Sequence, residues 1–224
     1  MRQLRADARR NREQILRAAH LAFLDQGPDA PLDQIATGAG VGNATLYRHF
    51  PTRADLIGAV VVDNMAQVAA LATEVLATEP SAGRALAAFA AGVVERRIVS
   101  MLPILGGHVA PDPAFQQART RLLDALNALV EAARAEGALR GDVSAADLVM
   151  FLTVVTRPLP SVSPDLDDAV RARLLATLLN GLRPGGTTPL PGAPLDVELI
   201  TADLTTANRD PAMISSTDSP PRLH

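Results

Sequence analysis

Apolar residues recur every three or four positions through most of the first 182 residues of this chain, and glycine or proline interrupts them at intervals. This spacing matches the turn of an α-helix, whereas a half-buried strand needs apolar and polar residues to alternate, and no long stretch of these 182 residues does so. Alanine, the strongest helix former, supplies 40 of the 224 residues. The sequence therefore predicts an all-α fold, with an aliphatic core because only 3% of the residues are aromatic.

The glycine and proline stops divide the chain into eight expected helices. They cover about residues 9–26, 32–39, 43–50, 52–78, 81–102, 113–136, 144–157 and 164–182. Thr52 followed by Asp55 has the spacing of a capping box at the start of the fourth helix. Beyond Arg183 the composition changes to proline, glycine and threonine, which bury too little apolar surface to offset the entropy of ordering. We expect residues 184–224 to form a mostly disordered tail, in which residues 195–200 could make a short local element.

Residues 32–50 have the pattern of two short helices joined by a tight turn. The first helix turns Ile35 and Ala36 inward, Gly40-Val41-Gly42 forms the turn, and the second helix buries Leu46 and Phe50 on one side. A small residue at the helix crossing and a glycine in the turn are what a helix-turn-helix needs for close packing. A dinucleotide-binding loop is the alternative for these glycines, but it requires a preceding buried strand and a glycine at position 43, which is asparagine.

The other face of the second short helix carries hydrogen-bonding side chains, namely Asn43, Thr45, Arg48 and His49. Asparagine and arginine pair with base edges, threonine offers a methyl or a hydroxyl group, and tyrosine, histidine and arginine donate to phosphate. The pattern predicts a helix that enters the major groove of double-stranded DNA.

The runs Ile35-Ala36, Ala39-Gly40-Val41 and Thr45-Leu46-Tyr47-Arg48-His49-Phe50 also carry a resemblance. With them, residues 9 to about 60 closely resemble the DNA-binding domain of TetR-family bacterial transcriptional regulators. The resemblance implies groove contacts from Asn43, Ala44, Thr45 and Arg48, and phosphate contacts from Tyr47, His49 and Arg53. Pro31 and Gly42 stand where many members have a serine or threonine cap, so neither helix start is expected to have a side-chain acceptor.

Positive charge is concentrated at the amino terminus. Residues 1–17 have six arginines and two acids, a net charge of +4, although the whole chain carries −3. We expect a basic arm over residues 1–8, and contacts to the DNA backbone or minor groove from Arg2, Arg5, Arg9, Arg10 and Arg12. A merely solvated tail is the alternative.

Catalytic and metal-binding patterns are absent from the sequence. The four histidines, His20, His49, His108 and His224, have no ligand spacing, the chain has no cysteine, and no nucleophile elbow occurs. We therefore expect no enzyme activity, no metal and no cofactor. The longest apolar run, residues 85–94, is too short to span a bilayer, and no apolar segment follows the charged amino terminus. A cytoplasmic protein without a membrane partner is expected.

The two last helices are apolar on most sides, so they need cover on most sides. We expect a second copy of the chain to provide it, in a homodimer interface that includes Leu148, Leu152, Val155, Leu174, Leu175 and Leu178. Helices at the centre of the core are the alternative. Two copies separated by about one DNA turn, roughly 34–36 Å, could engage adjacent major grooves on a pseudo-palindromic operator.

The family resemblance also implies a small-molecule effector, of unknown identity, bound among the helices between residues 81 and 157. Candidate pocket residues are Phe89, Val93, Met101, Phe115 and Phe151, with Arg97, Gln116, Arg119 or Thr153 as polar anchors.

The predicted organisation is a basic arm (1–8), a three-helix DNA-binding domain with the helix-turn-helix (9–55), a helical effector-binding and dimerisation domain (56–183) and a tail (184–224). The predicted function is a ligand-released repressor. The alternatives are a DNA-binding protein without an effector, and a helical enzyme or small-molecule carrier with a vestigial DNA-binding module.

Overall fold

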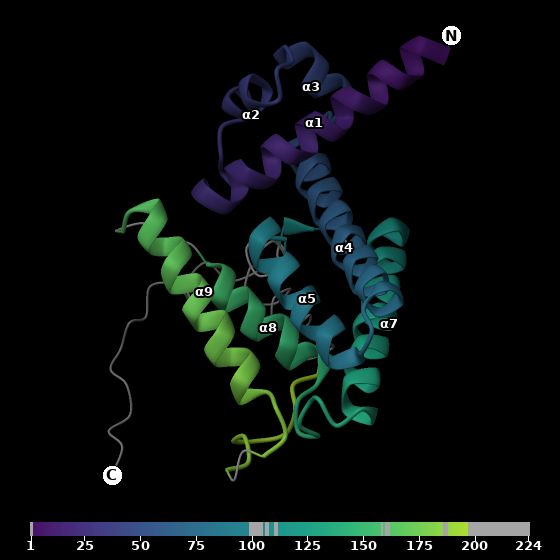
Figure 1. Cartoon of the computed structure of the whole chain (residues 1–224). Coiled ribbons are helices and arrows are strands. Elements are labelled where there is room, and N and C mark those ends of the chain that lie inside the picture. Colours follow the sequence, from purple (N-terminus) through teal and green to yellow (C-terminus); the bar gives the residue numbers. More distant parts are fainter. Residues whose placement is uncertain are drawn as a thin grey trace.

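The computed structural model describes residues 2–98, 105, 108–109, 112–157, 159, 162–185 and 188–196, apart from the side chains of residues 2–5. These residues form α1 (Arg2–Gln26), α2 (Leu32–Gly38), α3 (Asn43–His49), α4 (Arg53–Thr78), α5 (Ala82–Arg96), α7 (Pro113–Ala135), α8 (Ala145–Thr156) and α9 (Pro164–Gly181). Helices α1–α3 gather at one end, and α4 leads from them into the remaining helices (Figure 1). The predicted all-α fold is confirmed.

Two helix boundaries differ from the prediction. Helix α1 begins at Arg2, so the expected arm over residues 1–8 continues the helix instead of preceding it. Helix α5 ends at Arg96 instead of near residue 102, because Arg97 takes a left-handed conformation with φ 52°. The Arg97 N–H bonds the carbonyls of Val93 and Val94 and closes the helix. The end of the predicted helix, residues 99–102, lies outside the described residues.

The predicted caps are confirmed. At the start of α4, Thr52 Oγ1 accepts a hydrogen bond from the Asp55 N–H at 3.1 Å, and Asp55 Oδ2 accepts one from the Thr52 N–H at 2.9 Å. Pro31 before α2 and Gly42 before α3 provide no side-chain cap. Helix α4, the longest of the described helices, therefore starts with a complete capping box, as α8 also does.

The buried side chains form two cores, and α4 contributes to both. The amino-terminal core joins α1–α3 and the first half of α4 to the start of α7; its members include Ile15, Phe23, Ile35, Leu46, Leu56 and Phe115. The carboxy-terminal core joins the second half of α4 to α5, α7 and α8; its members include Leu71, Phe89, Val93, Leu129, Leu148 and Leu152. Helix α4 is long enough, and with a mean hydropathy of 1.6 apolar enough, to span a membrane. A buried helix that contributes to two cores has the same length and composition. The predicted domain boundary, between residues 55 and 56, falls inside this helix.

Three predicted dimer residues need correction. Leu148 and Leu152 have no exposed surface, and Val155 is 8% exposed. Leu148 and Leu152 belong to the carboxy-terminal core of the same chain. All three side chains are covered within the chain, so they leave almost nothing for a second subunit to cover. For these residues the central-core alternative holds.

The structure also differs from the predicted disordered tail, over residues 188–196. The Thr188 carbonyl accepts from Arg140 Nη2 at 2.9 Å, the Leu190 N–H donates to Asp142 at 3.1 Å, and the Leu195 carbonyl accepts from Ser144 Oγ at 2.9 Å. The bond from the Arg140 guanidinium lowers the pKa of Asp142 to about 2, so this acceptor stays charged. The sequence suggested disorder because the segment is apolar-poor, but side chains of the α7–α8 loop bind its backbone. Residues 197–224 lie outside the described residues.

Two matched truncations test this contact. A chain ending at Asp196 keeps these bonds and should unfold at the same temperature as the full chain. A chain ending at Arg183 loses them, at a cost of about 1–2 kcal/mol, and should melt about 2–8 °C lower by calorimetry. Equal melting temperatures for the two truncations would show that the segment adds no stability.

His20 lies where α1 meets α4 and the end of α5. Its imidazole is largely buried, which lowers its pKa; a hydrogen bond to the Arg97 carbonyl and the charge of Asp63 oppose this shift but are smaller. The imidazole Nε2 is buried without a partner among the described residues. The folded protein therefore favours the neutral ring.

This shift makes the stability depend on pH. Because the pKa of folded His20 lies below the ordinary value of 6.5, the unfolded chain binds the proton more readily, and stability should fall as the pH drops below 6.5. His20→Gln should show a smaller fall in unfolding free energy between about pH 7.5 and 5.5, measured by urea denaturation. His49, whose pKa is also lowered, is present in both proteins and cancels in the comparison. A parallel fall in the two proteins would contradict this assignment.

Candidate nucleic-acid interface

The turn between α2 and α3 has the backbone that its glycines permit. Gly40 has φ 68°, in the left-handed region that favours glycine. The Val41 N–H then reaches back to the Ala36 carbonyl at 3.0 Å, and the Gly42 carbonyl accepts from the Thr45 N–H at 2.9 Å. The chain thus leaves α2 and enters α3 within a few residues, as a helix-turn-helix requires.

Helix α3 is anchored by one apolar side. Leu46 and Phe50 are 1% and 3% exposed and belong to the amino-terminal core. Asn43, Ala44 and Arg48 are exposed, and Tyr47 is 51% exposed. The structure therefore brings these predicted DNA-binding residues onto the outer surface of a single helix, fixed from behind.

Thr45 and His49 are half-buried on the same helix. Burial, followed by the charges of Arg48 and Arg12, lowers the pKa of His49, so its ring is uncharged at neutral pH. The ring Nε2 is buried and has no partner among the described residues. A phosphate contact by His49 stays a prediction.

Arg53, the last of the predicted DNA contacts, already forms hydrogen bonds within the protein. Its Nη1 donates to the carbonyls of Pro28 and Ala30 at 2.9 and 2.6 Å, which fixes the loop between α1 and α2. Its other guanidinium donors are not engaged by these two bonds, and a phosphate contact by Arg53 stays a prediction.

Helix α1 places positive charge beside α3. The guanidinium of Arg12 lies over the ring of Phe50, 5.4 Å from its centroid, at the end of α3. Arg9 lies one turn earlier, where it forms an exposed ion pair with Glu13 at 3.7 Å, and the helix continues outward through Arg5 and Arg2 (Figure 1). The expected basic arm is thus an extension of α1 that begins next to the exposed face of α3.

The predicted pocket residues that the structure describes are divided between the two cores, and of them Phe115 lines a described pocket. Phe89 and Val93 have no exposed surface, so they pack in the carboxy-terminal core and do not line a cavity. Phe115 belongs to the amino-terminal core, whereas Phe151 is half-buried against the carboxy-terminal core. Met101 lies outside the described residues.

The polar anchors are equally dispersed. Arg97 faces acids on α9, and Arg119 is half-buried, with its Nε unpartnered among the described residues. Gln116 is exposed and Thr153 is half-buried. None of these four anchors lines one of the three pockets described among the residues that the structure covers, and an effector site at the anchors stays a prediction.

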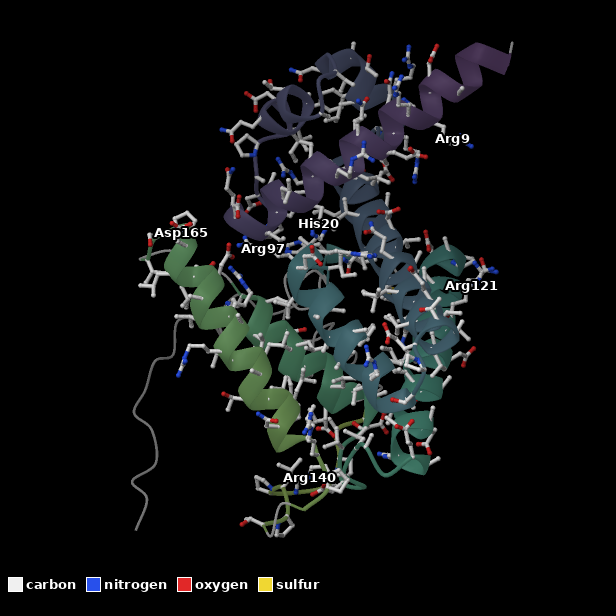
Figure 2. The ribbon with its side chains drawn as sticks, in the orientation of Figure 1. Arg9, His20, Arg97, Arg121, Arg140 and Asp165 are labelled. Carbon is white, nitrogen blue, oxygen red and sulfur yellow. The ribbon has the colours of Figure 1, made fainter. Side chains whose placement is uncertain are left out.

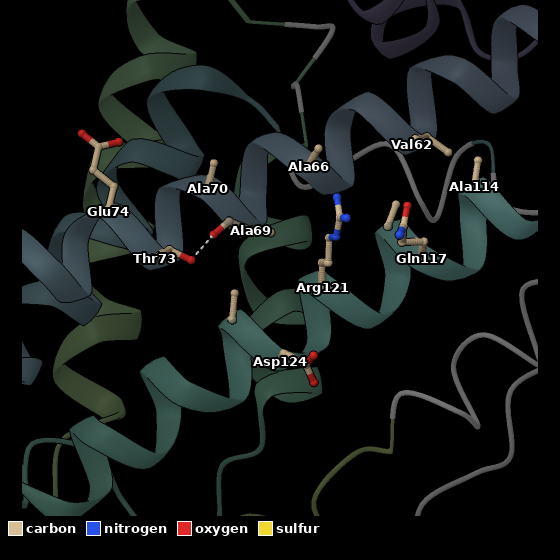
Figure 3. Close-up of a pocket in the computed structure, with 12 residues that line it drawn as sticks. Val62, Ala66, Ala69, Ala70, Thr73, Glu74, Ala114, Gln117, Arg121 and Asp124 are labelled. Atoms are coloured by element: carbon tan, nitrogen blue, oxygen red, sulfur yellow. Dashed lines mark hydrogen bonds between the residues drawn. The ribbon is translucent and has the colours of Figure 1, made fainter.

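Sequence reasoning missed Asn64, which is 5% exposed and has a buried amide nitrogen without a partner among the described residues. The signal was present, because Asn64 follows Val60 by four residues within the apolar stripe of α4. A groove of about 830 Å³ was also missed; it runs along the other side of α4 against α7 (Figure 3). It is lined by small residues, including Ala66, Ala69, Ala118 and Ala125, with Arg121 reaching from α7 toward α4.

Comparison with known proteins agrees with this geometry. Residues 15–60 match the family model described as bacterial regulatory proteins, tetR family, and residues 81–184 match the SbtR-like transcriptional regulator C-terminal domain. A segment of 57 residues is 44% identical to an uncharacterised HTH-type transcriptional regulator, TtgW, from Pseudomonas putida. The match spans 25% of this chain and only 42% of that relative's length.

Two solved structures extend the similarity over most of the chain. A TetR transcriptional regulator from Streptomyces coelicolor is 33% identical, with a TM-score of 0.58; the match covers 78% of this chain and 99% of the other. A TetR regulatory protein from Mycobacterium vanbaalenii is also 33% identical, with a TM-score of 0.56 and coverage of 80% and 99%. The chain belongs to the TetR family of DNA-binding transcriptional regulators.

Proposed function

We propose that the chain acts in the cytoplasm as a homodimeric repressor that binds a pseudo-palindromic operator and is released from it by a small molecule. The observation that supports this most directly is the outer surface of α3, where Asn43, Ala44, Tyr47 and Arg48 are exposed around a buried apolar side. A surface of this kind has no packing role in the protein.

The contacts follow from the chemistry of the exposed groups. The Arg48 guanidinium presents two parallel donors that match the O6 and N7 acceptors of guanine, and Asn43 can pair with adenine. The Tyr47 hydroxyl suits a phosphate oxygen, which fixes the position of the helix without reading sequence. Arg12 and the outward part of α1 add positive charge next to this helix, which suits the flanking backbone.

A dimer is supported by the apolar surface of α8 and α9. Val154 on α8 is 69% exposed, and Leu166 and Leu174 on α9 are 51% and 49% exposed. Leu166, Val170 and Leu174 follow each other by four residues, so they form one stripe along α9. Of the residues predicted from sequence, Leu174 belongs to this surface, and Leu175 and Leu178 are half-buried beside the core.

Release by a ligand requires a path from the ligand to α3. Helix α4 offers one, since its first half packs in the core of α1–α3 and its second half lines the groove with α7. A molecule wedged between α4 and α7 would tilt α4 and move the recognition helices away from the spacing of the operator. The open groove, lined largely by alanines, suits an apolar molecule, and Arg121, Glu74 and Asp124 add charged groups of both signs to its lining.

The DNA-contact assignment is tested by variants of α3 on an operator selected from randomised duplexes with the purified protein. Arg48→Ala and Thr45→Ala should each reduce the preference for operator over random DNA by about 1–3 kcal/mol, or roughly five- to 150-fold. Tyr47→Phe should weaken binding to both DNAs alike. If both alanine variants kept the wild-type preference, the contact assignment would be wrong. Failure of the selection to enrich any site would instead favour a carrier or enzyme with a vestigial DNA-binding module.

The dimer surface is tested by charge insertion. Leu174→Glu and Val154→Glu place a carboxylate in the proposed interface, once in each subunit, and should raise the dimer dissociation constant roughly a hundredfold or more, since each lost leucine contact is worth about 1.5–3 kcal/mol. Leu21→Glu, at a leucine on α1 that is 58% exposed, is the matched control and should leave the dimer intact. Sedimentation velocity over a concentration series gives the constant. Equal dissociation constants for all three variants would place the interface elsewhere.

A further inference from the structure

Arg97 has an unusual backbone for an arginine. It is the one non-glycine residue with positive φ, 52°, among those that the structure describes. The left-handed region is unfavourable for residues with a side chain, and glycine closes helices of this kind at no such cost. We therefore expect the contacts of the Arg97 side chain to provide a benefit that offsets the cost of this backbone conformation.

The two ends of Arg97 bind different parts of the protein. Its backbone lies beside His20 of α1, because His20 lines one small pocket together with Arg96 and Ile98, the two chain neighbours of Arg97. Its guanidinium Nη2 lies 3.6 Å from Asp167 Oδ2 and 3.9 Å from Asp168 Oδ1, both on α9. Figure 2 shows His20 and Arg97 next to each other below α1, with the start of α9 beside them at Asp165. One residue thus joins α1 to α9.

The α9 side of this contact is firmly built. Asp167 and Arg171 are 7% and 4% exposed and form a buried ion pair, and Arg171 also bonds Asp168 at 3.0 Å. Asp167 accepts from the Leu159 N–H at 3.3 Å, which ties the acid to the segment after α8. Arg97 therefore contacts an acid, Asp167, whose position is fixed by its bonds to Arg171 and to the Leu159 N–H.

Helices α4 and α7 also connect the DNA-binding helices to the rest of the protein. Helix α4 continues from them into the carboxy-terminal core, and Phe115 and Ala118 of α7 pack into their core. Helix α9 itself packs against α5 and α8. Among the residues that the structure describes, Arg97 joins the end of α5, beside α1, to the helix bearing the exposed stripe of Leu166 and Leu174.

We propose that Arg97 is a positioning residue that sets the separation of the two α3 helices in the dimer, by holding α1 at a fixed place relative to α9. This inference rests on the proposed function, since it takes α9 as a dimer helix and two half-sites as the target. Without the guanidinium, each DNA-binding unit would rock about α4, and the dimer would accept half-sites at several separations.

The experiment measures binding to a set of operators that differ only in the number of base pairs between the half-sites. One added base pair moves the half-sites apart by about 3.4 Å and rotates them by about 34–36°. Wild-type protein should prefer one spacing at least tenfold over its neighbours. Arg97→Gly removes the guanidinium while relieving the backbone, and its preference should shrink to about threefold or less. Affinity for an isolated half-site should stay near wild type, because α3 is untouched.

Three further variants make the result specific. Arg96→Ala, at the exposed neighbouring arginine, should keep the wild-type spacing profile. Asp168→Asn changes the partner acid, whose side chain is 72% exposed, and should broaden the profile in the same direction as Arg97→Gly even if the latter folds poorly. The double variant should be no broader than Arg97→Gly alone, as expected for two residues that act through one contact.

The outcomes separate the inference from the proposed function. If wild-type protein selects a spacing and both Arg97→Gly and Asp168→Asn retain that selectivity, the positioning role is overturned while the dimeric operator reading stands. If wild-type protein binds every spacing equally, the two-half-site function fails, and the inference fails with it. A broadened profile with unchanged half-site affinity supports the positioning role, because a general loss of stability would weaken both measurements.

Discussion

Helix α4 is the element on which the rest of the structure depends, because it buries apolar residues continuously in two successive cores. Leu56 and Val60 face the helices that present α3, whereas Leu71 and Val75 face α5 and α7. The two halves of the protein are thereby joined by one stiff rod with a capping box at its start. Any movement of its second half is carried to the first, since a helix transmits tilt over its whole length. This continuity is the physical basis of our proposal that a molecule in the groove beside α7 moves α3.

Close approach of the helices comes from small side chains. Gly92 of α5 lies where an added Cβ would meet Leu71 of α4 at 3.0 Å, and Gly83 where it would meet Ala138 at 2.9 Å. Larger residues at these positions would push the helices apart. The same use of small residues leaves the shallow alanine-lined groove between α4 and α7, because there is too little side-chain volume to fill it.

Arginine supplies the polar fastenings between the helices. Arg53 binds two carbonyls of the α1–α2 loop, and Arg140 binds Asp142 together with the carbonyl of Thr188. Arg97 extends this use to α9. The guanidinium has several donors in a rigid plane, so one side chain can satisfy acceptors from two segments, which an ammonium group does less well. The chain has no lysine, and many of its loop contacts are fixed in this way.

The sequence by itself determined the helices, the turn at Gly40 and the surface of α3, because these follow from local periodicity, capping and turn chemistry. It indicated the side of α3 that is buried, since Leu46 and Phe50 are four residues apart on a short helix. It did not determine which of the apolar residues of α8 face their own core, because Leu148 and Val154 are equally apolar and only the packing of α5 and α7 separates them. The docking of residues 188–196 and the ion pairs of Arg97 were decided by tertiary structure alone. Both sets of contacts join groups that are far apart in the chain. A local sequence pattern does not predict which distant acceptor a guanidinium or a backbone N–H will reach.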